Sequence, residues 1–189
     1  STTRQEVRAL EQSDGGRVLR LLDQRRLPGE EIWLELREIE PLAEAIETLT
    51  VRGAPAIGCA AAAGLAAASF GFSTKRGEFD AQVHGAIERL ARTRPTAVNL
   101  FVALEELRGV LDDADPSCPV DELRQRFVRA AQAHIKKDVS MNRAMGDHGA
   151  ALLPTGRCDA EPLPVSGRPR MQAQRDKPLR RVTKNNSST

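Results

Sequence analysis

The sequence predicts a mainly α-helical domain with a small N-terminal antiparallel β-sheet, an α+β fold. Hydrophobic residues make up 40 % of the 189 residues, but aromatic residues only 3 %, and Tyr is absent. A core of this kind, rich in Ala and Leu, favours packed helices over a long β-sandwich. Two short runs before residue 37 alternate partly between apolar and polar residues. From residue 42 onward, apolar residues recur at three- and four-residue steps.

The first predicted elements are two strands, residues 17–22 and 31–36. Pro28 and Gly29 between them are a turn signal, which predicts an antiparallel hairpin over residues 17–36. Helical spacing then begins after Pro41 and predicts a helix that contains Leu42, Ala45, Ile46 and Leu49.

Four more helices are expected. The second begins near Pro55 in residues 53–74, which contain no charged residue and are long enough to cross a bilayer. Because Ala and Gly dominate that stretch, we expect a central helix packed closely by its neighbours, and no membrane partner. The others are expected over residues 78–92, over 97–113 with Thr96 as the N-cap, and after an Asp121 cap. Gly146 and Gly149 are expected to mark the end of the last helix.

The composition changes near Pro154. Residues 154–189 contain eight basic and three acidic residues, five prolines and no aromatic residue. We therefore expect a domain over residues 1–153 and a disordered basic tail over residues 154–189. The tail has no aromatic residues for base stacking, so no nucleic-acid partner is expected. Three widely spaced cysteines and the lack of an apolar leader predict a cytoplasmic protein with no metal site.

Two segments share a design suited to anion binding. In Val51–Pro55 and in Thr93–Thr96, an Arg comes just before the start of a predicted helix. Unpaired N–H groups and the helix dipole favour an anion there, and an Arg guanidinium matches phosphate oxygens. The alternative is that Arg52 and Arg94 each pair with a surface carboxylate beside a turn.

Other candidate residues have simpler explanations. His84 and His134 lie in predicted helices without an i+4 partner that would suit a metal site. Cys59, inside the Ala-rich helix, is expected to be a small buried residue and not a nucleophile. His148 is explained by the helix end.

Four segments, in order and spacing, resemble the S-methyl-5-thioribose-1-phosphate isomerases of methionine salvage, which are related to the regulatory subunits of eukaryotic initiation factor 2B. The segments are Leu22–Pro28, Val51–Gly58 with the preceding Ala45–Ile46, Thr93–Leu100 and Asn142–Ala150. The resemblance implies an aldose-ketose isomerase that converts 5-methylthioribose 1-phosphate into 5-methylthioribulose 1-phosphate without a cofactor. It also implies that Arg52, Gly53, Ala54 and Arg94 bind the substrate phosphate, and that the domain is the N-terminal part of the isomerase.

The sequence also departs from that family. The Rossmann-like C-terminal domain of the family, with its Thr-His-Cys-Asn and Gly-Ala-Asp motifs for the catalytic Cys and Asp, is missing from this sequence. We assign no catalytic residue here, Cys158 included, and expect a truncated chain that is inactive alone. Helices that pack on the missing domain would expose apolar faces, so a homodimer is expected. The alternative function is a non-catalytic phosphate-binding or subunit-contact module like the initiation factor 2B regulatory subunits.

Overall fold

The computed structural model describes residues 9–152. The chain divides into two units, Ser1–His148 and Gly149–Thr189, and the elements below lie in the first unit, except for the last residues of the final helix. The expected boundary near Pro154 and the basic tail lie outside the described residues, and so does Cys158.

The N-terminal sheet has three antiparallel strands, in the order β1 (Leu10–Ser13), β2 (Val18–Leu22) and β3 (Trp33–Leu36). The predicted hairpin is confirmed as β2 and β3, with Leu22 opposite Trp33. Strand β1 was not predicted, because its four residues contain only one bulky apolar side chain. A short 3-10 turn, Asp14–Gly16, connects β1 to β2.

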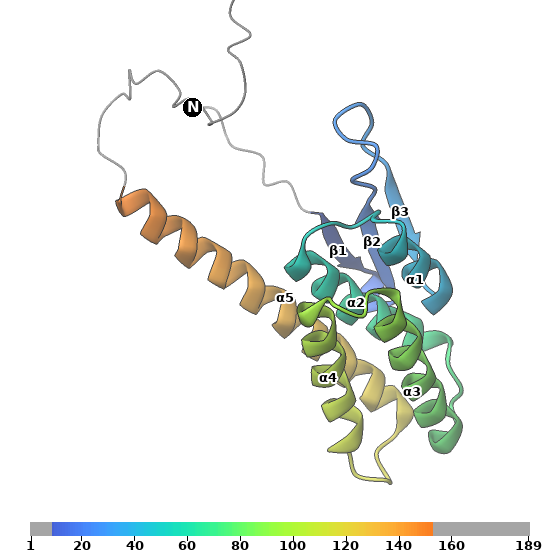
Figure 1. The fold of residues 1–189 in the computed structure, drawn as a ribbon. Helices are drawn as coiled ribbons and strands as arrows, with labels where there is room; N and C mark the ends of the chain where they lie inside the picture. The colour runs from blue at the N-terminus through green and yellow to red at the C-terminus, as the bar shows by residue number, and fades with distance from the viewer. Residues whose placement is uncertain (1–8, 153–189) are drawn as a thin grey trace, which may run out of the picture. The chain divides into compact units, whose positions relative to one another are not determined.

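Within residues 9–152, five helices follow the sheet, as expected (Figure 1). They are α1 (Ile39–Glu47), α2 (Ala54–Ala68), α3 (Arg76–Thr93), α4 (Val98–Asp112) and α5 (Val120–Ala151), with a 3-10 turn η2 (Ser69–Gly71) after α2. Pro41 lies in the first turn of α1, where its missing N–H removes no helical hydrogen bond. The expected end of α5 is wrong, because the helix continues through Gly146 and Gly149.

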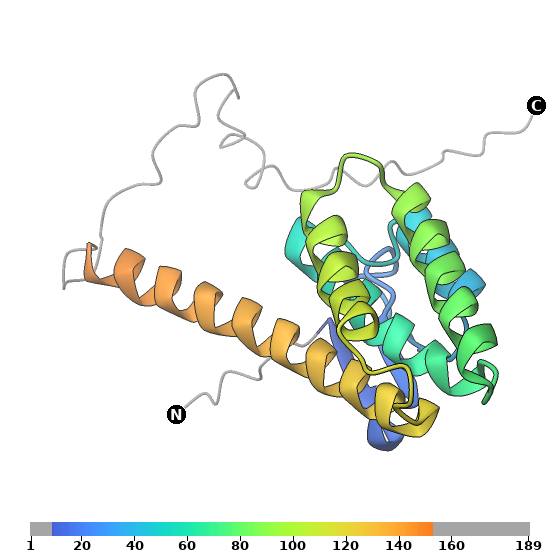
Figure 2. The same ribbon diagram turned by 90° about the horizontal axis from the view of Figure 1, so that it is seen from below.

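Helix α2 lies at the centre of the helical layer, between the sheet and α4 in Figures 1 and 2. Every residue from Ile57 to Ala68 is buried, and the helix packs most extensively on α4. Close approach depends on Gly58, where a Cβ would lie 2.7 Å from the backbone oxygen of Asn99. By length and composition, Ala54–Gly71 could cross a membrane, but 72 % of this window is buried within the structure. The expectation of a tightly packed central helix is therefore confirmed.

The N-terminal half of α5 is fixed to the rest of the domain by a buried cation. The Arg124 guanidinium donates to the backbone oxygens of Ser69 (3.0 Å) and Phe72 (2.8 Å), and it forms an ion pair with Asp121. Phe127, one turn later, stacks on Phe79 of α3 with ring centroids 6.1 Å apart. These contacts place the middle of α5 beside the first turns of α2 and α4, where the candidate site lies.

Candidate functional site

Three of the four predicted site residues lie where the loop before α2 meets the helix. Thr50 and Val51 are buried, whereas the Arg52 side chain is exposed. Gly53 is the N-cap residue with φ +97°, a conformation that favours glycine, and Ala54 is the first residue of α2. The first hydrogen bond of the helix runs from the Ile57 N–H to the Gly53 oxygen (3.0 Å). The N–H groups at the start of α2 therefore have no partner within the helix.

The loop before α4 contains the fourth predicted residue, Arg94. The Ala97 N–H donates to the Arg94 oxygen (3.0 Å), and α4 begins at Val98. The expected Thr96 cap is wrong, because Ala97 is the N-cap residue and makes no side-chain cap hydrogen bond. The N–H groups of Leu100 and Phe101 both point to the Ala97 oxygen, so the helix begins one residue too late for Thr96 to cap it.

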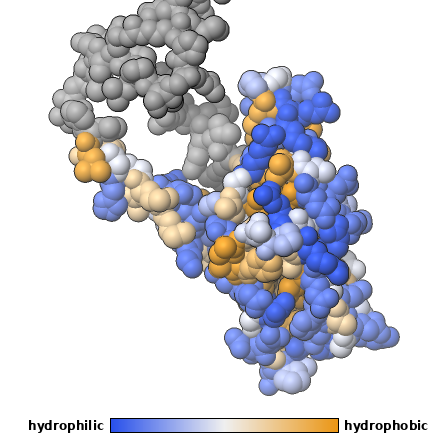
Figure 3. Space-filling view, viewed as in Figure 1, coloured by the Kyte–Doolittle hydropathy of each residue, from blue (hydrophilic) through white to orange (hydrophobic). Residues whose placement is uncertain are grey.

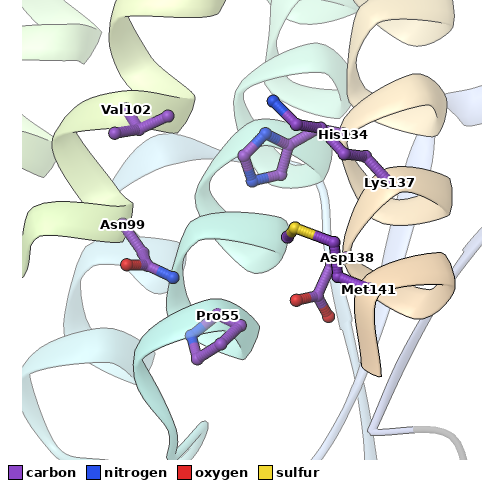
Figure 4. A pocket seen from close by; sticks show the side chains of 7 residues that line it. All are labelled: Pro55, Asn99, Val102, His134, Lys137, Asp138 and Met141. Atoms are coloured by element: carbon purple, nitrogen blue, oxygen red, sulfur yellow. The ribbon is translucent and has the colours of Figure 1, made fainter. Parts of the chain in front are cut away.

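The two helix N-termini lie side by side in both ribbon views (Figures 1 and 2). Pro55 of α2 and Asn99 of α4 line one cavity of about 130 Å³, which α5 closes (Figure 4). The other lining residues are Val102, His134, Lys137, Asp138 and Met141. The fold thus brings together two segments that are more than 40 residues apart in the sequence.

The Arg52 and Arg94 guanidinium groups have no hydrogen-bond or ion-pair partner among residues 9–152. The alternative explanation, that each pairs with a surface carboxylate, therefore fails for the described part of the chain. By contrast, Arg25 and Arg89 each bind carboxylates through short contacts. An unpaired Arg in the loop before a helix start, where the first N–H groups are also unpaired, is suited to an anion.

A polar cluster beside this cavity was not predicted from the sequence. His134 Nδ1 lies 2.6 Å from Glu106 Oε2 on α4, and Lys137 Nζ lies 3.7 Å from Glu106 Oε1. The His134 side chain is only 13 % exposed and points between α2 and α4 (Figure 4). No local signal could reveal this pair, because Glu106 lies 28 residues earlier on another helix. Within residues 9–152, no group of three His, Cys, Asp or Glu side chains could hold a metal ion.

Cys59 faces a second, larger groove of about 740 Å³ between β1, α2 and α5. Burial raises the pKa of its thiol to about 12, and the nearby Asp138 carboxylate adds to the shift. The thiol is therefore protonated at neutral pH, which agrees with its expected role as a small buried residue.

An apolar surface lies where α4 begins, beside the cavity. Val98, Phe101 and Val102 are exposed there, Val98 to 71 %. On α5, Met141 and Met145 are also exposed. Figure 3 shows apolar residues gathered on this face of the molecule, over the start of α4. Apolar side chains of α4 and α5 are thus exposed.

Comparison with known proteins identifies the family. Residues 50–158 match the family model of the Initiation factor 2 subunit family. This chain belongs to that family. A methylthioribose-1-phosphate isomerase from Syntrophotalea carbinolica is 41 % identical over 167 residues, covering 85 % of this chain and 48 % of the relative. The isomerase from Heliobacterium modesticaldum is 43 % identical over 155 residues, covering 79 % of this chain and 45 % of the relative. The chain thus spans about half the length of the curated relatives it matches.

Solved structures from two branches of the family share the fold. The 5-methylthioribose 1-phosphate isomerase from Pyrococcus horikoshii OT3 superposes with a TM-score of 0.73 and 38 % identity, covering 79 % of this chain and 41 % of that one. The translation initiation factor eIF-2B, subunit delta, from A. fulgidus superposes with a TM-score of 0.70 and 38 % sequence identity, covering 79 % of this chain and 43 % of that one. The predicted fold class and the resemblance to this family are both confirmed.

Proposed function

We propose that this chain supplies the phosphate-binding part of a methylthioribose-1-phosphate isomerase, with Arg52, Gly53, Ala54 and Arg94 as the phosphate ligands. The observation that carries the proposal is that the N-termini of α2 and α4 meet at one cavity, and that the Arg before each helix has no partner for its guanidinium among residues 9–152. Identity of about 40 % to proteins named as this isomerase supports the choice of substrate.

In this proposal the site holds the substrate and does not itself move protons. The N–H groups of Gly53 and Ala54 and the two guanidinium groups bind phosphate oxygens by charge-assisted hydrogen bonds. An aldose-to-ketose isomerisation removes a proton from C2 of the sugar and returns one to C1, which requires an acid and a base. Binding that is equal in the ground and transition states does not accelerate that step. We therefore expect this chain to be incomplete and inactive alone. We expect it to be active only when another chain supplies the missing half.

Calorimetry with 5-methylthioribose 1-phosphate tests the proposal directly. We expect the wild-type chain to bind the sugar phosphate, and Arg52→Ala or Arg94→Ala to weaken binding by roughly 10- to 100-fold, because each variant removes hydrogen bonds to a charged group. Arg126→Ala is the matched control, since Arg126 belongs to neither loop and its guanidinium pairs with Glu122 along α5. Binding of unphosphorylated 5-methylthioribose with equal affinity would contradict a phosphate site.

The second candidate function is a subunit-contact module without catalysis. It is favoured by the equal identity of the initiation factor subunit structure and the isomerase structure to this chain, 38 % in each case. A chain of this type would bind no sugar phosphate and would associate through the apolar surface at Val98, Phe101 and Val102. We also propose a cytoplasmic homodimer, and sedimentation velocity at increasing concentration tests the dimer.

A further inference from the structure

Gln24 connects the end of β2 to the loop before α2 through two hydrogen bonds. Its backbone N–H donates to the Thr50 oxygen (3.0 Å), and its side-chain Oε1 accepts from the Arg52 N–H (3.1 Å). The two bonds reach alternate residues of the loop and span 26 and 28 positions of sequence. They act on the backbone immediately before Gly53.

The side chain of Gln24 takes the place of a backbone carbonyl. In a parallel pair of segments, a residue donates its N–H to one residue of the neighbouring segment, and its backbone oxygen accepts from the N–H two residues further along. Here the chain turns away after Gln24, because Asp23 accepts from the Arg25 N–H (3.0 Å) and binds its guanidinium through two further contacts. The turn leaves no backbone oxygen for the Arg52 N–H, and the Gln24 amide oxygen supplies one.

The Gln24 hydrogen bond fixes only the backbone of Arg52. The Arg52 side chain has no partner among residues 9–152. Thr50 and Val51 are buried and Thr50 is bonded to α1 through the Ala45 oxygen (2.9 Å), so the loop is anchored up to Val51. Beyond it, Arg52 is exposed and Gly53 has few steric restraints. The bond to Gln24 Oε1 is therefore the hydrogen bond that holds the Arg52 backbone where it leads into Gly53.

We infer that Gln24 is a positioning residue for the phosphate site: it holds the Arg52 backbone in the binding conformation before the ligand arrives. This inference rests on the proposed function. A loop that is already ordered loses less conformational entropy when it binds. The hydrogen bond from the Arg52 N–H to Gln24 Oε1 therefore raises affinity, although Gln24 does not touch the ligand.

Two measurements on the Gln24→Met variant test the inference. Met has a similar length but no acceptor, so the Arg52 amide hydrogen should exchange at least about tenfold faster by NMR, since its hydrogen bond is lost. Affinity for 5-methylthioribose 1-phosphate should fall by about 3- to 10-fold, because the loop must then be ordered on binding. Gln24→Glu keeps an acceptor oxygen and should restore the slow exchange of the Arg52 amide.

Gln82→Met is the matched control. Gln82 Oε1 accepts from the Ser73 N–H (2.7 Å), a bond of the same kind at the start of α3. This variant should leave both the Arg52 exchange rate and the affinity at their wild-type values. Equal loss of affinity in both variants would indicate a general loss of stability and would overturn the inference.

The outcomes separate the inference from the proposed function. If Arg52→Ala weakens binding but Gln24→Met changes neither exchange nor affinity, the phosphate site stands and the role of Gln24 is wrong. If exchange becomes faster while affinity stays constant, Gln24 is structural only, and the inference is again overturned. If the wild-type chain binds no sugar phosphate, the proposed function fails, and the positioning role fails with it.

Discussion

The loops before α2 and α4 have similar sequences but are held in different ways. Each has an Arg within a few residues of a Pro and of a helix start. The loop before α2 is fixed by buried side chains, by the Gln24 hydrogen bonds and by Gly53 at a positive φ. The loop before α4 has one turn hydrogen bond, between Ala97 and Arg94, and no side-chain cap. The shared sequence pattern therefore predicts both helix starts, but it does not determine how many contacts fix each loop.

The α2–α4 crossing keeps the two loops adjacent, and it depends on Gly58. Gly58→Ala is the change expected to have the largest effect, because the new Cβ would lie 2.7 Å from the backbone oxygen of Asn99. A backbone atom cannot yield as a flexible side chain does, so the helices must separate. We expect the free energy of unfolding to fall by about 2–3 kcal/mol in urea denaturation.

Gly85→Ala provides the control for that change. Gly85 lies inside α3, and a Cβ added there would meet no atom within 4 Å. Because Ala is the better helix former, the same substitution should raise the free energy of unfolding by up to about 1 kcal/mol. Equal effects at both positions would show that the α2–α4 crossing is not tight.

The second prediction concerns Asp23, which supports the turn that places Gln24 against the loop before α2. Asp23 is 4 % exposed, and the Arg25 hydrogen bond lowers its carboxyl pKa from 3.8 to about 2. Asp23→Asn should lower the free energy of unfolding at pH 7 by on the order of 1–2 kcal/mol, a value reduced for solvent screening because Arg25 is partly exposed. The loop before α4 contains no such pair among the described residues.

The pH dependence of stability identifies the cause of that loss. A carboxyl with a lowered pKa in the folded state stabilises the fold above its unfolded pKa and stops doing so as the pH falls through the folded value. The difference between wild type and Asp23→Asn should therefore be full above about pH 4 and decline toward pH 2. A difference that stays constant from pH 7 to pH 2 would mean that Asp23 acts through packing and not through its charge.

The sequence predicted the elements with strong periodicity and missed the features made by long-range contacts. The β2–β3 hairpin, the five helices and the burial of the Ala-rich helix follow from local patterns. Strand β1 could not be predicted, since its pairing with β2 depends on the partner and not on its own side chains. The hydrogen bonds between Gln24 and Arg52 and between Glu106 and His134 each join residues 28 positions apart. At that separation, the spacing of residues along the sequence does not predict contacts.

The last prediction concerns the loop before α4, which fewer contacts hold in place. The sequence favours Thr96 as a helix cap, and a true Thr cap stabilises a protein by about 1 kcal/mol. Here Thr96 is exposed and α4 begins after Ala97 without a side-chain cap, so Thr96→Ala should change the free energy of unfolding by less than about 0.5 kcal/mol. The affinity for 5-methylthioribose 1-phosphate should also stay constant. A loss near 1 kcal/mol in thermal or urea unfolding would show that Thr96 does cap α4, and the two loops would then be held more alike than the structure indicates.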